Sequence, residues 1–316
     1  MAKILTITLN PAIDVTLELD ELRLGEVNRQ QQVQYHAAGK GLNVAQVLHD
    51  LGHDLIVSGF LGKQNRALFD QHFQAMQFDN QFVYVEGETR QNIKIAEQSG
   101  RMTDINAKGF LVSEHDKQAF FARIQACCQN VDYVVIAGSL AQGFSIDDFK
   151  YLISILHKQQ KHVAIDSSGQ ALVAAIEMNP WMIKPNTDEL QESFGESVEQ
   201  FSQQIALFQR LNCHIEHIVI SMGEAGVNWI NPALALHASP PKVTVKSTVG
   251  AGDSLLAGMV HGLVSGMTPE QTLKTATAIA SHAVSQIGFR VPEHERLETL
   301  KQQTMINTLD KSDANN

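Results

Sequence analysis

The chain has 316 residues, of which 44% are hydrophobic and 18% are charged. It is too long and too apolar to be disordered, and we expect one large domain or two unequal domains. With 24 Lys and Arg against 34 Asp and Glu, the formal net charge is −10. Such a chain has no broad basic face, so we expect neither nucleic acid nor a membrane among its partners.

The cysteines and the apolar segments indicate where the protein acts. Cys127, Cys128 and Cys213 are odd in number and lack metal-ligand spacing, which is typical of free thiols in a reducing compartment. The apolar runs fall short of the roughly 18 residues that a membrane span needs. Residues 3–9 have the alternation of a strand and not the pattern of a signal peptide. We therefore expect a cytoplasmic protein.

Short β-branched segments alternate with helical segments, which is typical of a parallel sheet covered by helices on both faces. The predicted strands are 3–9, 54–60, 132–137, 162–166, 181–184 and 217–221. Residues 13–35 and 81–109 instead alternate charged with apolar side chains, which predicts antiparallel strands that form a small lid. Residues 227–245 contain three prolines and predict a hairpin followed by a linker.

These patterns predict the fold class and the domain boundaries. We expect a three-layer α/β/α domain with a mainly parallel sheet, built from residues 1–12, 36–80 and 110–301. A β-sheet lid would comprise residues 13–35 and 81–109. The polar residues 302–316 would form a partly frayed C-terminal tail.

A glycine turn near the C-terminus carries the clearest chemical signal. Residues 247–254 read Ser-Thr-Val-Gly-Ala-Gly-Asp-Ser and precede apolar residues at helical spacing. The N–H groups of Gly250, Ala251 and Gly252 would converge at the start of this helix and form an anion hole. Asp253 is then either a simple helix cap or a carboxylate beside the bound anion.

An anion hole beside a carboxylate suits phosphoryl transfer to an alcohol. The N–H groups stabilise charge on the phosphoryl group, and Asp253 accepts the hydroxyl proton. The dinucleotide fingerprint fits poorly, because Leu255 stands where a third glycine is needed. The phosphate-loop motif with Gly-Lys-Ser/Thr is absent, because Gly41 follows Lys40 and Gln64 follows Lys63.

A second glycine motif precedes an earlier predicted helix, at residues 36–45 with the sequence His-Ala-Ala-Gly-Lys-Gly-Leu-Asn-Val-Ala. Together with residues 248–254 it closely resembles the two signature motifs of the ribokinase-like (PfkB) carbohydrate kinases. The resemblance extends over nearly the whole chain. Within the family it is strongest to the bacterial branch that acts on fructose 1-phosphate, through residues 59–63, 103–106 and 180–186.

This resemblance implies an activity and its cofactors. The protein would transfer phosphate from ATP, with Mg²⁺, to the C6 hydroxyl of fructose 1-phosphate, giving fructose 1,6-bisphosphate and ADP. It would also pair with a second copy through the lid, as a homodimer. Alternatives are a kinase for fructose 6-phosphate or tagatose 6-phosphate, a catalytically silent sugar or nucleotide sensor, and, as the weakest, a dehydrogenase.

The resemblance also assigns the residues on the sugar side. Gly39, Asn43 and Asp14 would bind sugar hydroxyls, Arg90 would hold the substrate phosphate, Ser139 would touch the substrate, and Lys40 and Lys63 are further candidate phosphate contacts. The same positions have structural readings: a helix start for residues 39–43, a solvated turn for Asp14 and a charged lid surface around Arg90. Ala141 and Gln142 stand where similar enzymes have prolines, which weakens the match after Ser139.

The nucleotide side is expected at residues 184–190 and 221–226. Asn186 and Glu189 resemble the family's magnesium motif, although a helix cap with a first-turn acid explains the same spacing. The residues expected to contact ATP are Lys184, Asn186, Ser221, Met222, Gly223, Glu224, Ala225, Gly226, Thr248 and Gly252.

Overall fold

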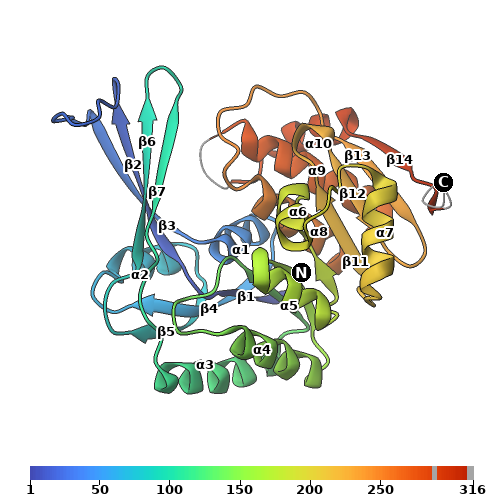
Figure 1. Ribbon diagram of the computed structural model, residues 1–316, viewed down its shortest axis with the longest axis horizontal. Helices are drawn as coiled ribbons and strands as arrows, with labels where there is room; N and C mark the ends of the chain where they lie inside the picture. The colour runs from blue at the N-terminus through green and yellow to red at the C-terminus, as the bar shows by residue number, and fades with distance from the viewer. Residues whose placement is uncertain (287–289, 312–316) are drawn as a thin grey trace.

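The computed structural model describes residues 1–286 and 290–311. Its main sheet has ten strands in the order β14-β13-β12-β11-β10-β9-β8-β1-β4-β5. Figure 1 shows this sheet covered by helices, with a smaller sheet projecting from the domain. The predicted three-layer α/β fold with a small lid is confirmed. No helix in the described part of the chain has the length and hydropathy needed to cross a bilayer.

The strands of the main sheet follow the predicted alternation closely. They are β1 Lys3–Thr8, β4 Asp54–Gly62, β5 Asp79–Val85, β8 Tyr133–Ala137, β9 His162–Asp166, β10 Met182–Ile183, β11 His217–Ser221, β12 Val227–Ile230, β13 Ala235–Ser239 and β14 Met305–Thr308. The helices are α1 Lys40–Asp50, α2 Ala67–Ala75, α3 Glu114–Cys127, α4 Ile146–Lys158, α5 Gly169–Glu177, α6 Thr187–Phe194, α7 Phe201–Leu211, α8 Ala251–Val264, α9 Pro269–Val284 and α10 His294–Gln303, with short 3₁₀ turns at Cys128–Asn130 and Gly223–Ala225.

The centre of the sheet is parallel. β1 pairs in parallel with β4 and with β8, and the parallel pairing continues through β9 and β10 to β11. Only the hairpin β12–β13 and the edge strand β14 are antiparallel. The carboxyl ends of β1, β8, β9, β10 and β11 therefore lie along one edge of the sheet, where ligands of open α/β sheets bind.

Helices bury apolar side chains against both faces of this sheet. On one face α1, α2, α8 and α9 pack around Leu48, Phe69 and Leu256. On the other face α3, α4 and α5 pack around Phe120 and Leu152, and α6 and α7 continue that layer. Burial on both faces explains why the central strands lack hydrophobic alternation.

The lid is a separate four-stranded sheet in the order β3-β2-β6-β7. Its strands are β2 Ala12–Leu19, β3 Gln32–Ala38, β6 Arg90–Glu97 and β7 Met102–Asn106. The outer pairs are antiparallel as predicted, but the central pair β2–β6 is parallel. The predicted boundary at residue 81 is wrong, because residues 81–85 belong to β5. This strand pairs with β4 and buries Phe82, Val83 and Val85.

The predicted frayed tail also needs correction. Residues 305–308 form β14, which adds to the main sheet by antiparallel pairing with β13. Ile306 is the half-buried residue of this strand and packs against the core. The strand was missed because a sheet edge needs few apolar side chains when its backbone hydrogen bonds supply the pairing. Residues 312–316 of the predicted tail lie outside the described residues.

Candidate active site

The two glycine motifs meet at Asp253. Gly250 is the N-cap of α8 with φ +82°, a conformation that favours glycine, and it directs the chain into a helix whose first turn contains Asp253. Asn43 lies in the first turn of α1, which begins after Gly39. Its amide Nδ2 donates a hydrogen bond of 2.7 Å to Oδ2 of Asp253. Both side chains are more than nine-tenths buried, so residues 210 positions apart form one polar site.

The first turn of α8 is open to an anion. No side chain caps this helix. The N–H of Ala251 makes only a long contact of 3.4 Å with the carbonyl of Thr248. Within the part of the chain that the structure describes, the N–H groups of Gly252 and Asp253 have no acceptor. Unpaired N–H groups at a helix start attract anions, so this turn has the chemistry of the predicted anion hole.

Four charged groups gather around Asp253. Lys40, the first residue of α1, extends its ammonium to 3.3 Å from Asp166 Oδ1 and 3.7 Å from Glu189 Oε1. The other oxygen of Asp166 lies 3.3 Å from Nζ of Lys184, which is buried. A Cβ placed on Gly252 would lie 3.2 Å from the same Nζ, so Lys184 stands beside the glycine turn. Three carboxylates and two ammonium groups thus share a poorly solvated region.

Burial and charge shift the acidity of these groups. Burial, and after it the charge of Asp166, raise the pKa of Asp253 from 3.8 to about 6. Lys40, Asn43 and Lys184 oppose this rise. For Lys40, burial lowers the pKa, but the charges of Asp166, Asp253 and Glu189 outweigh burial and raise it overall. Asp253 is therefore poised near neutral pH as a proton acceptor, whereas Lys40 stays charged.

The expected nucleotide side lies along the same edge. Asn186 caps α6: its Oδ1 accepts from the N–H of Glu189 at 2.6 Å, and Glu189 Oε2 accepts from the N–H of Asn186 at 3.0 Å. The capping reading of this motif is therefore correct, and it leaves Glu189 Oε1 turned towards Lys40. At the end of β11, Ser221 forms an isolated parallel β-bridge with Asn186. The turn from Met222 to Gly226 is closed by a backbone hydrogen bond of 2.8 Å.

The predicted phosphate ligand Arg90 lies at the hinge of the lid. Its guanidinium donates to the carbonyls of Pro11, Ala107 and Asn10 at 3.0–3.3 Å. Asn10 in turn donates to Ser139 Oγ at 3.2 Å. Ser139 is exposed and follows β8, as predicted. These contacts place Arg90 and Ser139 in one group at the carboxyl end of β1.

This hinge group connects to the charged cluster through two close approaches of the backbone. A Cβ on Gly39 would lie 3.2 Å from Cα of Pro11, so α1 begins directly against the hinge. A Cβ on Gly138 would lie 3.7 Å from Cβ of Lys40. Gly39, Lys40 and the hinge group therefore lie along the same edge as the charged cluster.

Asp14 points into the polar face of the lid. Lys94 Nζ lies 2.5 Å from its Oδ2, and Asn92 Nδ2 donates to its Oδ1 at 3.3 Å. The solvated-turn reading of Asp14 is wrong, because its side chain is only 13% exposed. Lys63 instead pairs with Glu86 at the surface.

Sequence reasoning missed Asp166 and Asn10, and it explained Lys94 as part of a charged lid surface. Asp166 is fully buried at the last position of β9, and a buried acid at the carboxyl end of a parallel strand is the signal that could have identified it. Lys94 and Asn10 carry no comparable signal, because their roles depend on partners 80 and 129 positions away.

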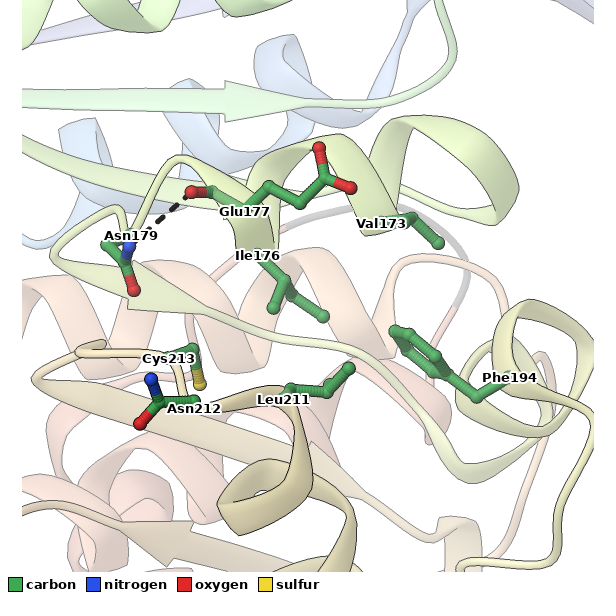
Figure 2. A pocket seen from close by; sticks show the side chains of 8 residues that line it. All are labelled: Val173, Ile176, Glu177, Asn179, Phe194, Leu211, Asn212 and Cys213. Carbon is green, nitrogen blue, oxygen red and sulfur yellow. Dashed lines mark hydrogen bonds between the residues drawn. The ribbon is translucent and has the colours of Figure 1, made fainter.

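A separate cavity lies away from this edge. It has a volume of about 220 Å³ and is lined by α5, α6 and the end of α7. Figure 2 shows Ile176, Leu211 and Phe194 around it, with Glu177 and Asn179 beside them. None of the predicted site residues lines this cavity, so it is not the candidate active site.

Comparison with known proteins identifies the family. The family model described as pfkB family carbohydrate kinase matches residues 2–296. The chain belongs to the pfkB family of carbohydrate kinases. It is 44% identical over 308 residues to a 1-phosphofructokinase of Vibrio cholerae, with 97% of each chain covered. Other 1-phosphofructokinases match at 40% identity.

Two further similar proteins are informative. A tagatose-6-phosphate kinase of Staphylococcus epidermidis is 34% identical over 279 residues, covering 87% of this chain and 90% of that protein. The solved structure of phosphofructokinase-2 from Escherichia coli in complex with potassium has a TM-score of 0.87 at 25% identity, covering 96% of this chain and 99% of that one. The expected ribokinase-like fold and kinase class are confirmed, and membership of this kinase family implies the use of ATP.

The raised pKa of Asp253 has a testable consequence for stability. An ordinary Asp in the unfolded chain has a pKa near 3.9, so the folded protein holds this proton more tightly. The contribution of Asp253 to stability must then fall as the pH rises from about 4 to about 6, by about 2 to 3 kcal/mol. Asp253→Asn removes this cost, and we expect a melting temperature several degrees above the wild type at pH 8.

Thermal melts at pH 4 and pH 8 test this expectation, with Asp188→Asn on the exposed start of α6 as the matched control. The control should change the melting temperature little at either pH. An Asp253→Asn protein that melts at or below the wild-type temperature at pH 8 would show that the carboxylate is not strained in the folded state.

Proposed function

We propose that this pfkB kinase transfers the γ-phosphoryl group of ATP to the C6 hydroxyl of fructose 1-phosphate, giving fructose 1,6-bisphosphate and ADP. The observation that carries the proposal is the hydrogen bond between Asn43 and Asp253, which would join a sugar-binding motif to a catalytic base beside an open helix start. The identity of 44% to a 1-phosphofructokinase over nearly the full length supports this substrate.

The reaction follows from the groups around α8. Asp253 accepts the proton of the C6 hydroxyl while the C6 oxygen of the sugar forms a bond to the γ-phosphorus of ATP. The bond from that phosphorus to the oxygen that bridges it to ADP breaks at the same time. The free N–H groups of Gly252 and Asp253 face the charge on the transferred group, with Gly250 and Ala251 shaping the turn. Asn43 holds the Asp253 carboxylate in place.

Arg90 would hold the phosphate at the other end of the sugar. Three of its five N–H groups serve backbone carbonyls, which leaves two for a phosphate. Gly39, Asp14 and Ser139 would contact the hydroxyls between the two ends, and Lys40 lies on the same path.

ATP would bind along the ends of β10 and β11. Lys184 would face its phosphates, Asn186 and Ser221 would line the groove, and the turn from Met222 to Gly226 with Thr248 would receive the adenosine.

The described residues contain no group of three or more His, Cys, Asp or Glu side chains that could hold a metal. Magnesium bound with nucleotide phosphates needs only one or two carboxylates, and Glu189 Oε1 with Asn186 fits that demand. Magnesium would supply charge neutralisation at the phosphates.

The three cysteines are free thiols in the structure, which fits the proposed cytoplasmic location.

We also propose that the lid pairs with the lid of a second copy. Leu17, Leu19, Leu22 and Ile95 line a hollow of about 550 Å³ on its apolar face. Tyr35 and Ile105 stand in register on this face and are more than half exposed. An apolar face of this kind is typical of a subunit interface.

The substrate proposal is tested by ADP release from fructose 1-phosphate, fructose 6-phosphate, tagatose 6-phosphate and fructose. We expect fructose 1-phosphate to give the highest kcat/KM, and Asp253→Asn to lower kcat by about 10² to 10⁴ because it lacks the base. A higher kcat/KM for tagatose 6-phosphate would favour the second candidate, which rests on the 34% identity to a tagatose-6-phosphate kinase. Near-normal turnover of Asp253→Asn would show that Asp253 is not the base in this reaction.

Arg90→Gln tests the phosphate site. Loss of a charge-assisted contact should raise KM for fructose 1-phosphate by about 10- to 100-fold and leave KM for fructose nearly unchanged. The comparison with fructose is the control, because Arg90 also ties three carbonyls at the lid hinge. An equal loss with both sugars would mean that Arg90 only holds the hinge.

The lid interface is tested by sedimentation velocity on two neighbouring substitutions in β3. Tyr35→Lys places a charge on the apolar face and should give a monomer. Gln34→Lys places the same charge on the opposite face of the strand and should leave a dimer. A wild-type protein that sediments as a monomer at micromolar concentration would contradict the interface.

A further inference from the structure

The ammonium group of Lys40 lies between two carboxylates, where a metal ion could also bind. Its ammonium contacts Asp166 Oδ1 at 3.3 Å and Glu189 Oε1 at 3.7 Å. Asp166 is fully buried, and the Glu189 side chain is 15% exposed. The second oxygen of Glu189 is used by the N–H of Asn186, so Oε1 is the oxygen left for a cation.

The geometry makes the Lys40 ammonium a counter-ion that two carboxylates share, and not one half of an ordinary surface ion pair. Asp166 Oδ2 is buried without a hydrogen bond, and among the described residues the ammonium of Lys184, at 3.3 Å, is the cation paired with it. A buried carboxylate without a nearby cation would be costly, so the ammonium of Lys40 balances the charge of both acids in the ligand-free protein. Its side chain is nevertheless 41% exposed and flexible, which allows the ammonium to leave without unfolding α1.

We infer that the ammonium of Lys40 takes the position of the metal ion in the ligand-free protein, where it pairs with Asp166 and Glu189. The ammonium and a divalent cation then compete for the same carboxylate oxygens. This inference rests on the proposed placement of magnesium at Asn186 and Glu189. Displacement frees the ammonium beside Gly138 and the first turn of α1, on the path between Asp253 and the lid hinge. A single side chain thereby couples arrival of the metal to a free positive charge on the sugar side.

Competition predicts that removing the ammonium strengthens metal binding. Lys40→Met keeps most of the side-chain length and its helix propensity but loses the charge. The probe is Mn²⁺ in the absence of nucleotide and sugar, with free Mn²⁺ measured by electron paramagnetic resonance. We expect Lys40→Met to bind Mn²⁺ at least about tenfold more tightly than the wild type, because a unit charge at this distance is not fully screened.

Three further variants make the result specific. Lys63→Met removes a lysine that pairs with Glu86 elsewhere on the surface, and it should bind Mn²⁺ as the wild type does. Glu189→Gln should weaken binding, and the double variant Lys40→Met with Glu189→Gln should lose the gain of Lys40→Met. Addition of Mn²⁺ should also raise the melting temperature of Lys40→Met more than that of the wild type.

The outcomes separate this inference from the proposed function. Equal Mn²⁺ affinity in the wild type and Lys40→Met, or no binding to Lys40→Met at about 10 mM Mn²⁺, overturns the competition. If Glu189→Gln leaves Mn²⁺ binding unchanged, the proposed metal position fails and the competition fails with it. The kinase proposal is judged independently, by the sugar panel and Asp253→Asn.

Discussion

Ionisation of the buried Asp253 carboxylate is the constraint on which the rest of the site depends. Removal from water makes its charged form unfavourable, and Asp166 adds repulsion. Lys40, Lys184 and the amide of Asn43 offset this cost only in part, which leaves a pKa of about 6. A carboxylate with ordinary acidity would be a weaker base, and one without these partners would stay protonated at neutral pH.

The fold places these partners by a simple rule of parallel sheets. The parallel strands β1, β8, β9, β10 and β11 end at the same edge of the sheet, where the candidate site lies. β9 ends in Asp166, β10 is followed by Lys184, and β8 is followed by Ser139. The starts of α1 and α8 bring Asn43 and Asp253 to the same edge from the layer above. The lid hinge adds Arg90, so that one edge serves both ends of a small phosphorylated sugar.

Much of this arrangement could be predicted from the sequence, because it depends on local patterns. The turn at Gly250 favours a glycine with positive φ, and Asn186 with Glu189 three positions later has the spacing of a capping box. Long-range contacts could not be predicted in the same way. The pairing of Lys40 with Asp166 spans 126 positions, and β14 is added to a sheet edge through backbone hydrogen bonds that any sequence can make. The lid boundary at residue 81 failed for a similar reason, since β5 alternates like a lid strand but finds its partner in β4.

The pKa of Asp253 in the ligand-free protein tests the electrostatic basis of the site most directly. Selective ¹³C labelling of aspartate carboxyl groups, with the Asp253→Asn spectrum for assignment, would follow this group by NMR between pH 3 and pH 9. The account predicts a titration midpoint of about 6. A midpoint near 4, the value of an ordinary exposed Asp, would show that Asp253 is well solvated and would contradict the electrostatic basis of the site.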